Sequence, residues 1–192
     1  IIARNYIVEE MPDVIINIVD ATNIERNLYL TTQLIELGLP IVVALNMMDE
    51  IKKRGDKIDV NGLEKAFGVP IIPTSASKGQ GVSQLMQKAI ELAQAGAASQ
   101  ETKFTLKIFD DEIENTIEKI ENLIVPFIKG TKYPARWVSI KLLEGDERVR
   151  EKLAVTNEII DSVKVLRKEL EHKYDDDIEA IIADNRYRFI TG

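Results

Sequence analysis

The sequence contains no cysteine and only one histidine, His172. Disulfide bonds, zinc–thiolate sites and cysteine nucleophiles are therefore excluded, and so is a metal site built from several histidines. No apolar run approaches the roughly 18 residues that a membrane-spanning helix needs. Basic residues are in the minority, because 25 Lys and Arg stand against 32 Asp and Glu and leave a net charge of −7. This balance argues against nucleic acid as a partner, because phosphate binding requires a basic face.

What is present is the composition of an ordinary globular chain, with 45% hydrophobic and 30% charged residues. The 192 residues are enough for one large domain or two small ones. The sequence opens with IIARNYIVEE, which has neither an initiator Met nor a signal-peptide pattern. We therefore expect it to be a part of a longer chain.

The first half alternates short apolar runs with amphipathic segments. The apolar runs are 14–19, 41–45 and 70–74, and the segments with helical spacing are 25–37, 61–68 and 82–96. Alternation of buried strands with helices predicts an α/β fold with a parallel sheet. The charged stretch 50–59, EIKKRGDKID, is expected to be a loop.

The second half has no strand pattern. Apolar residues recur at steps of three and four in four segments, 110–128, 136–145, 156–171 and 177–186. Four helices without strands predict a small all-α domain. The polar segment 98–104 lies between the two patterns, so we place a linker there, with one domain at 1–97 and the other at 105–192.

Polar side chains follow two of the predicted strands. Asn46 and Asp49 end the second strand, and Ser75-Ala76-Ser77 ends the third. In open α/β sheets ligands bind outside the carboxyl ends of the strands. A carboxylate accepts two parallel hydrogen bonds, and guanine offers two adjacent donors, N1–H and the N2 amine. Asp49 therefore suits guanine and would be left partly unpaired by adenine, while backbone N–H groups of 75–77 suit the guanine O6.

The spacing N-x-x-D is by itself weak, because Asn and Asp also close strands in ordinary Asx turns. Its position after a buried strand, followed by S-A-S, a glycine-rich KGQG turn and a helix, favours the base-binding half of a GTPase. The Met47-Met48 pair between the two polar residues remains unexplained by spacing alone.

The run DATNIERNLYLTTQLIELGLPIVVALNMMDE resembles the cytosolic GTPase domain of the FeoB family of prokaryotic ferrous iron transport proteins. ARWVSIKLLEGD and the terminal IADNRYRFITG resemble the family's helical spacer. The resemblance implies a P-loop-NTPase-like parallel sheet, present as the C-terminal half of a G domain and so incomplete, followed by the helical domain. Most GTPases have Lys where this chain has Met47, and a thioether stem is equally able to cover the base.

The resemblance also implies ligands and partners. The ligand is GTP or GDP, bound by Asn46, Met47, Asp49 and Ser75–Ser77, with Mg²⁺ held by residues that the family carries upstream of Ile1. No G-x-x-x-x-G-K-[ST] run occurs in the sequence, so GTP hydrolysis is implied by the family rather than by residues seen here. The implied partners are the transporter's own membrane domain, small Feo accessory proteins and further copies of the chain, at the cytoplasmic face of the plasma membrane.

Two other interpretations stay open at this point. The chain would be a non-catalytic interaction module if the G-domain scaffold had lost nucleotide binding. A ribosome-associated GTPase would fit the base motif, but it explains the acidic charge and the helical half poorly.

Several residues have a simpler interpretation than a site. The carboxylate clusters 110–112 and 175–177 are expected to start helices, since acidic residues complement the N-terminal dipole. Trp137 is expected to anchor helix packing. Arg186 and Arg188, near the end of the sequence, fit a cytoplasmic approach to a membrane under the positive-inside tendency.

Overall fold

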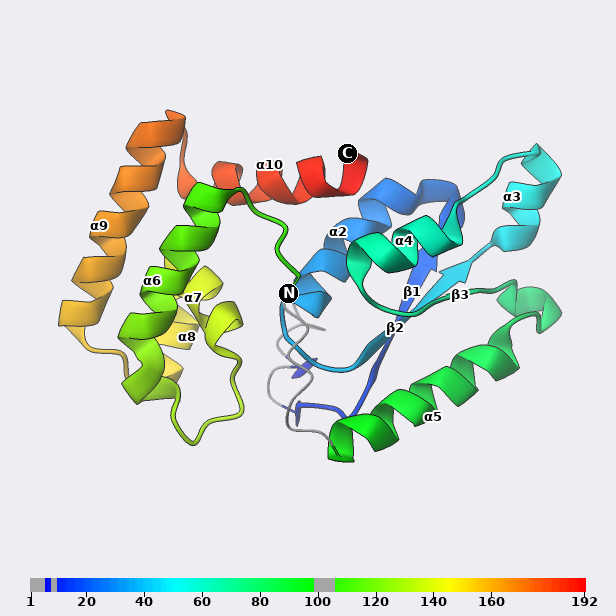
Figure 1. Ribbon diagram of the computed structural model, residues 1–192, viewed down its shortest axis with the longest axis horizontal. Helices are drawn as coiled ribbons and strands as arrows, with labels where there is room; N and C mark the ends of the chain where they lie inside the picture. Colours follow the sequence, from blue (N-terminus) through cyan, green and yellow to red (C-terminus); the bar gives the residue numbers. More distant parts are fainter. Residues whose placement is uncertain (1–5, 8–9, 99–105) are drawn as a thin grey trace. The chain divides into compact units, whose positions relative to one another are not determined.

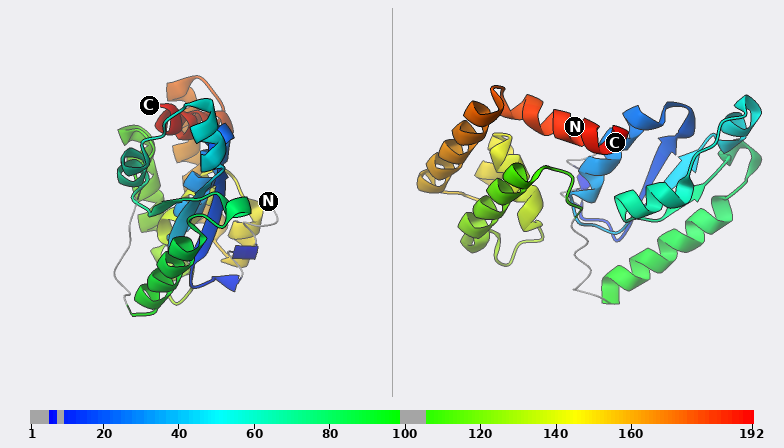
Figure 2. Two further views of the ribbon diagram at one scale, coloured as in Figure 1. Left: turned by 90° about the vertical axis from the view of Figure 1, so that its right-hand side faces the viewer. Right: turned by 45° about the horizontal axis from the view of Figure 1, so that its top comes forward.

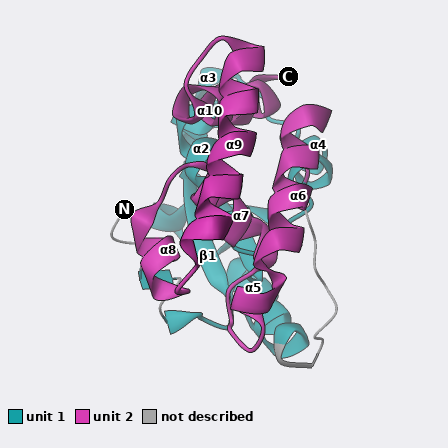
Figure 3. Cartoon of the chain, turned by 90° about the vertical axis from the view of Figure 1, so that its left-hand side faces the viewer, with its two compact units in different colours: residues 1–106 teal, residues 107–192 magenta. Residues whose placement is uncertain are grey.

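The computed structural model describes residues 6–7, 10–98 and 106–192. The chain divides into two compact units, residues 1–106 and residues 107–192 (Figure 3). Ala98, the first residue of the predicted linker, is the last residue of a helix in the first unit, and the rest of that linker lies outside the described residues.

The first unit confirms the predicted parallel sheet. Its described strands lie in the order β1-β2-β3 and are all parallel. Their bounds are β1 (Ile15–Asp20), β2 (Ile41–Asn46) and β3 (Ile71–Pro73). The helices between and after them are α2 (Ile24–Ile35), α3 (Met48–Arg54), α4 (Val60–Phe67) and α5 (Val82–Ala98) (Figure 1).

Helices α2 and α5 cover opposite faces of this sheet (Figure 2). On one face, the Asn17 amide of β1 donates to the Thr31 hydroxyl of α2 over 2.7 Å, and both residues are buried. On the other face, Val42 and Ala44 of β2 pack in one cluster with residues of α5. Burial on both faces explains why β2 is a continuous apolar run, as is usual for a central parallel strand.

The charged stretch 50–59 is not simply a loop, and this expectation was wrong. Its first half belongs to α3, which has Asp49 and Glu50 in its first turn and three basic residues in its last turn. Both sets of charges complement the helix dipole. Gly55 then ends the helix in the left-handed conformation, with φ 78°. Helical charge order and a glycine stop were therefore visible in the sequence, although the apolar periodicity was not.

The second unit is all-helical, with five helices among its described residues rather than the predicted four. They are α6 (Asp111–Ile128), α7 (Ala135–Leu143), α8 (Glu147–Lys152), α9 (Asn157–Tyr174) and α10 (Ile178–Thr191). The missed helix is α8, which has only six residues and so shows little periodicity. Asp146 caps α8 by accepting from the N–H groups of Arg148 and Val149.

The core of the second unit is built on α6 and α7. The side chains that α6 turns inward are fully buried, namely Ile113, Ile117, Ile120 and Ile124. The structure confirms Trp137 of α7 as a packing residue, because it is 5% exposed and stacks on Tyr133 with 5.9 Å between ring centroids. Asp110 and Asp177 cap α6 and α10, as expected of the two acidic clusters, whereas Asp175 ends α9 in the left-handed conformation, with φ 53°.

Charged side chains also lie inside this unit, and Arg186, which was noted in the sequence for the positive-inside tendency, is one of them. Arg186 is only 2% exposed and pairs with Glu144 over 3.0 Å. Lys141, 3% exposed, pairs with the same carboxylate. Arg188 does face solvent, where it pairs with Asp184. A buried arginine requires a partner because an unpaired charge in the interior is costly, and that partner is 42 residues away in the sequence.

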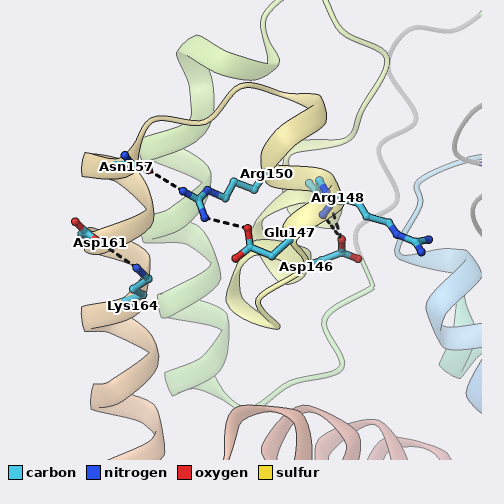
Figure 4. Close-up of polar contacts among 8 residues, drawn as sticks. Asp146, Glu147, Arg148, Arg150, Asn157, Asp161 and Lys164 are labelled. Carbon is cyan, nitrogen blue, oxygen red and sulfur yellow. Dashed lines mark hydrogen bonds and ion pairs between the residues drawn. The ribbon is translucent and has the colours of Figure 1, made fainter.

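An ion pair and a hydrogen bond at the surface stabilise the turn from α8 to α9 (Figure 4). Arg150 pairs with Glu147 over 2.9 Å and donates to the Asn157 side chain over 2.7 Å. Ala154, in the turn between α8 and α9, takes a positive φ of 50°, which is unusual for a residue with a side chain.

Within the described part of the chain, no helix is both long enough and apolar enough to span a membrane.

Candidate functional site

The carboxyl ends of the three described strands lie at one edge of the sheet. Asp20, the last residue of β1, is in register with Asn46, the last residue of β2. Leu45 is in register with Pro73, the last residue of β3. The parallel register therefore brings the two polar segments that were singled out in the sequence, 46–49 and 75–77, to neighbouring positions.

Asn46 fixes the segment that follows β3. Its Oδ1 atom accepts from the Thr74 hydroxyl over 3.2 Å and from the Ala76 backbone N–H over 3.0 Å. The backbone repeats this link, because Met48 N–H donates to the Thr74 carbonyl over 3.1 Å. Asn46 is thus a positioning residue whose acceptor atom is occupied, and within the described ranges its Nδ2 group has no side-chain partner.

Asp49 lies in the first turn of α3 and is tied to the same segment. Its backbone N–H donates to the Ser75 hydroxyl over 3.0 Å, and Ser75 is only 3% exposed. Its carboxylate Oδ2 lies 2.8 Å from the Lys78 ammonium. The hydrogen bond from Lys78 lowers the pKa of the Asp49 carboxyl against the opposing effect of partial desolvation, so the group is an anion at neutral pH.

Met47 precedes Asp49 in a strained backbone conformation. The φ angle of Met47 is 68°, in the left-handed region, and Met47 is 38% exposed. The left-handed region costs a residue with a side chain about 1–2 kcal/mol, so the surroundings must hold it there. Strain of this kind is common at binding sites, and it sets the thioether at the exposed end of β2.

The turn after β3 is locked by glycine. Ser75 and Gln80 form an antiparallel bridge, with hydrogen bonds of 3.0 and 3.2 Å between their backbones. At Gly81, where φ is 75°, a Cβ atom would lie 2.2 Å from the Pro73 carbonyl oxygen. Only glycine fits there, which explains why KGQG follows the polar segment.

The structure thus brings together Asn46, Asp49, Ser75 and Ala76 through direct hydrogen bonds. Met47 and Ser77 lie beside them and are exposed, while the Ala76 N–H, expected to face a ligand, donates to Asn46 instead. Lys78 was not singled out in the sequence. It follows a recognisable motif directly, but nothing in the sequence spacing shows that its side chain reaches Asp49.

The sheet is parallel, has helices on both faces and gathers polar strand ends at one edge. This is the arrangement of the second half of a G domain of the P-loop NTPase class. Comparison with known proteins makes the assignment specific. Residues 1–89 match the family described as ferrous iron transport protein B, and residues 109–192 match the FeoB cytosolic helical domain. The chain therefore belongs to the FeoB family.

Individual relatives match over nearly the whole chain. The Fe(2+) transporter FeoB of Escherichia coli (strain K12) is 34% identical over 100% of this chain. An Fe(2+) transport protein A/FeoB fusion protein of Porphyromonas gingivalis is 37% identical over 98% of it. The chain spans 23% of the length of each of these two relatives. The family match favours a FeoB-type protein over a ribosome-associated GTPase.

Solved structures agree in fold. NFeoB from S. thermophilus bound to GDP.AlF4⁻ and K⁺ is 37% identical, with a TM-score of 0.87 over 98% of this chain and 71% of that one. The same protein bound to mGMPPNP gives a TM-score of 0.85 at 37% identity, over 98% of this chain and 68% of the other. Both solved structures contain a guanine nucleotide or an analogue of one.

Proposed function

We propose that residues 1–97 are the base-recognising part of a GTPase domain and that residues 105–192 are its helical spacer, in the cytosolic region of a ferrous iron transporter. The observation that carries the proposal is the Asp49 carboxylate, ionised and held at the sheet edge by the same segment that Asn46 positions. Guanine nucleotides in the solved FeoB relatives support the choice of ligand.

Each residue of the proposed site has its own part in binding the guanine base. Asp49 accepts from guanine N1–H and the N2 amine, which together match the two carboxylate oxygens. Asn46 keeps the loop at 75–77 in place, and its Nδ2 group faces the remaining edge of the base. Met47 covers the ring with its thioether stem. Ser75 orients Asp49 through the Asp49 N–H, while Ala76 and Ser77 line the O6 side.

In the whole protein, GTP binding and hydrolysis would be coupled to Fe²⁺ uptake through the membrane domain, at the cytoplasmic face of the plasma membrane. The helical spacer would pass on the nucleotide state, which needs only a few kcal/mol of bias between two arrangements. Small Feo accessory proteins and further copies of the chain are the other partners in this proposal. Its support is family membership and the presence of the FeoB helical domain at 109–192.

The described residues include no acidic cluster that would hold Mg²⁺ without the phosphates of a nucleotide. Among residues 6–7, 10–98 and 106–192, no group of three or more His, Asp or Glu side chains is placed to hold a metal ion. No step is therefore assigned to a metal bound by this part of the chain.

Replacing Asp49 with Asn tests base recognition. An amide presents one acceptor and one donor, so the N2 amine of guanine meets an N–H group, and we expect GDP affinity to fall about 100-fold. Xanthine carries an oxygen where guanine has its amine, so XDP should bind better than GDP to the variant. Titration calorimetry with both nucleotides measures this reversal.

Asp59→Asn is the matched control, because it removes the same charge from the same unit. Asp59 caps α4 by accepting from Gly62 N–H, and Asn caps a helix equally well. Its GDP affinity should equal that of the unsubstituted protein. Unchanged GDP affinity in Asp49→Asn would refute the base-recognition role, and an unsubstituted protein that binds no GDP would favour the interaction-module alternative.

A further inference from the structure

The Asp49 carboxylate already holds a cation from its own chain. The Lys78 ammonium lies 2.8 Å from Oδ2, and the two side chains differ in exposure, at 14% for Asp49 and 48% for Lys78. The pair joins the first turn of α3 to the 3-10 turn after β3, Ala76–Lys78. It therefore lies on the atoms to which the proposed function assigns guanine.

The backbone holds Lys78 at this position, while its side chain is half exposed. Lys78 N–H donates to the Ser75 carbonyl over 2.9 Å, and Gly79 N–H donates to the Ala76 carbonyl over 3.0 Å. The Cα atom is thus fixed by the turn. The ammonium sits at the end of a flexible four-carbon stem that is half exposed, so it is able to leave the carboxylate without any change in the fold.

The chemistry of the two ligands differs. A lysine ammonium is a compact, strongly hydrated charge that returns to water at little cost. Guanine approaches with two parallel donors, N1–H and the N2 amine, and occupies both carboxylate oxygens in the plane that they define. Both ligands use the same oxygen, Oδ2, and the base gains a second hydrogen bond that the ammonium does not.

We propose that Lys78 is an internal competitor for the guanine site: it neutralises the Asp49 carboxylate in the empty state and is displaced when the base binds. The inference rests on the proposed function. It makes Lys78 a residue that sets nucleotide affinity through Asp49. Because every bound nucleotide must first displace the ammonium, the pair weakens binding by the strength of the ion pair.

The test uses single and double substitutions in the full-length protein. The GDP affinity of each variant is measured by titration calorimetry. Lys78→Met keeps the length of the stem and removes the charge. We expect it to bind GDP about two- to five-fold more tightly, the range typical of a partly exposed ion pair. Lys78→Arg keeps a cation within reach of Asp49 and should stay close to the unsubstituted affinity.

Lys53→Met is the matched control. Lys53 lies in α3, the helix that carries Asp49, and it pairs with Glu50 over 2.5 Å, so its loss removes the same charge while the Lys78–Asp49 pair stays in place. Its GDP affinity should not rise. The advantage of Lys78→Met should also shrink as salt is raised from about 0.1 to about 1 M, because salt screens the pair.

The Asp49→Asn variant shows whether Lys78 acts on nucleotide affinity only through its ion pair with Asp49. Without the carboxylate there is no ion pair to displace, so adding Lys78→Met should leave XDP affinity unchanged. GDP affinity that is equal or weaker in Lys78→Met than in the unsubstituted protein would overturn the competition and leave base recognition standing. Failure of the unsubstituted protein to bind GDP would instead contradict the proposed function, and the competition would fall with it.

Discussion

Two ion pairs, one in each unit, lie in opposite environments. In the first unit, the Asp49–Lys78 pair lies at the open edge of the sheet, with the lysine half exposed. In the second unit, Glu144 contacts Arg186 and Lys141, whose side chains are 2% and 4% exposed. The first pair is able to exchange with a ligand or with water. In the second pair both cations are buried, so it is expected to stabilise the fold.

This difference follows from the two architectures. A parallel sheet ends in a row of loops, so polar residues that follow the strands remain accessible to a ligand. A helical bundle presents side chains from every helix to a shared interior, where a charge persists only when it is paired. The Asp49–Lys78 pair is therefore placed for binding, and the Glu144 pairs are placed for stability.

Glu144→Gln is expected to give the largest effect, and it tests the structural half of the comparison. The substitution removes the anion that contacts both Arg186 and Lys141, and breaking a buried pair costs about 3 kcal/mol or more. Trp137 is the single tryptophan of the chain and lies in α7, so its fluorescence during urea unfolding reports on this unit. Asp184→Asn, at an exposed pair, should change the free energy of unfolding by less than about 1 kcal/mol.

The pH dependence of the same transition gives a second measurement. Burial acts to raise the pKa of Glu144, but Lys141 and Arg186 outweigh it and hold the pKa below its ordinary value of 4.5. A carboxyl whose pKa is lowered by folding contributes stability above its unfolded pKa and loses it as pH falls toward the folded value. The loss below pH 4.5 should be smaller in Glu144→Gln. An equal loss in both proteins would contradict the role of this carboxylate.

The comparison also shows what the sequence could predict. The strands and the segments at 46–49 and 75–77 were predictable because their signals are local, and β2 is an unbroken apolar run followed at once by Asn46. The helix α3 was missed because its signal is charge order, with only Ile51 buried. Neither Arg186 nor Lys78 was predictable, since the first depends on Glu144, 42 residues away, and the second on the shape of a turn.

Gly81→Ala is expected to have a smaller and more local effect, and it tests the accessible half of the comparison. The new Cβ would lie 2.2 Å from the Pro73 carbonyl at a φ that disfavours side chains, so the turn must shift, at a cost of about 1–3 kcal/mol. Exchange of the Ala76 N–H, which donates to Asn46, should become faster, and GDP affinity should fall. Gly79→Ala has open space around its Cβ and the same sign of φ, so it separates the clash from the backbone strain.

Equal losses in the two alanine variants would mean that strain alone matters at this turn. A larger loss in Gly81→Ala would show that the close approach to Pro73 holds the loop in register with Asn46. The Trp137 unfolding transition provides the internal reference, because neither glycine belongs to the second unit.

The smallest expected effect comes from a matched pair of strained residues, one in each unit. Met47 has φ 68° and Ala154 has φ 50°, and glycine takes both conformations without steric cost. Relief of strain favours the folded state by about 1–2 kcal/mol, but glycine also gives the unfolded chain more freedom, so we expect each Gly variant to gain at most about 1 kcal/mol. The gain in Ala154→Gly is measured by the Trp137 transition, and that in Met47→Gly by thermal unfolding of the first unit. Only Met47→Gly should lose GDP affinity, because only Met47 is proposed to cover a base. Equal GDP affinity in the two variants would show that the strain at Met47, like that at Ala154, serves the turn rather than the ligand.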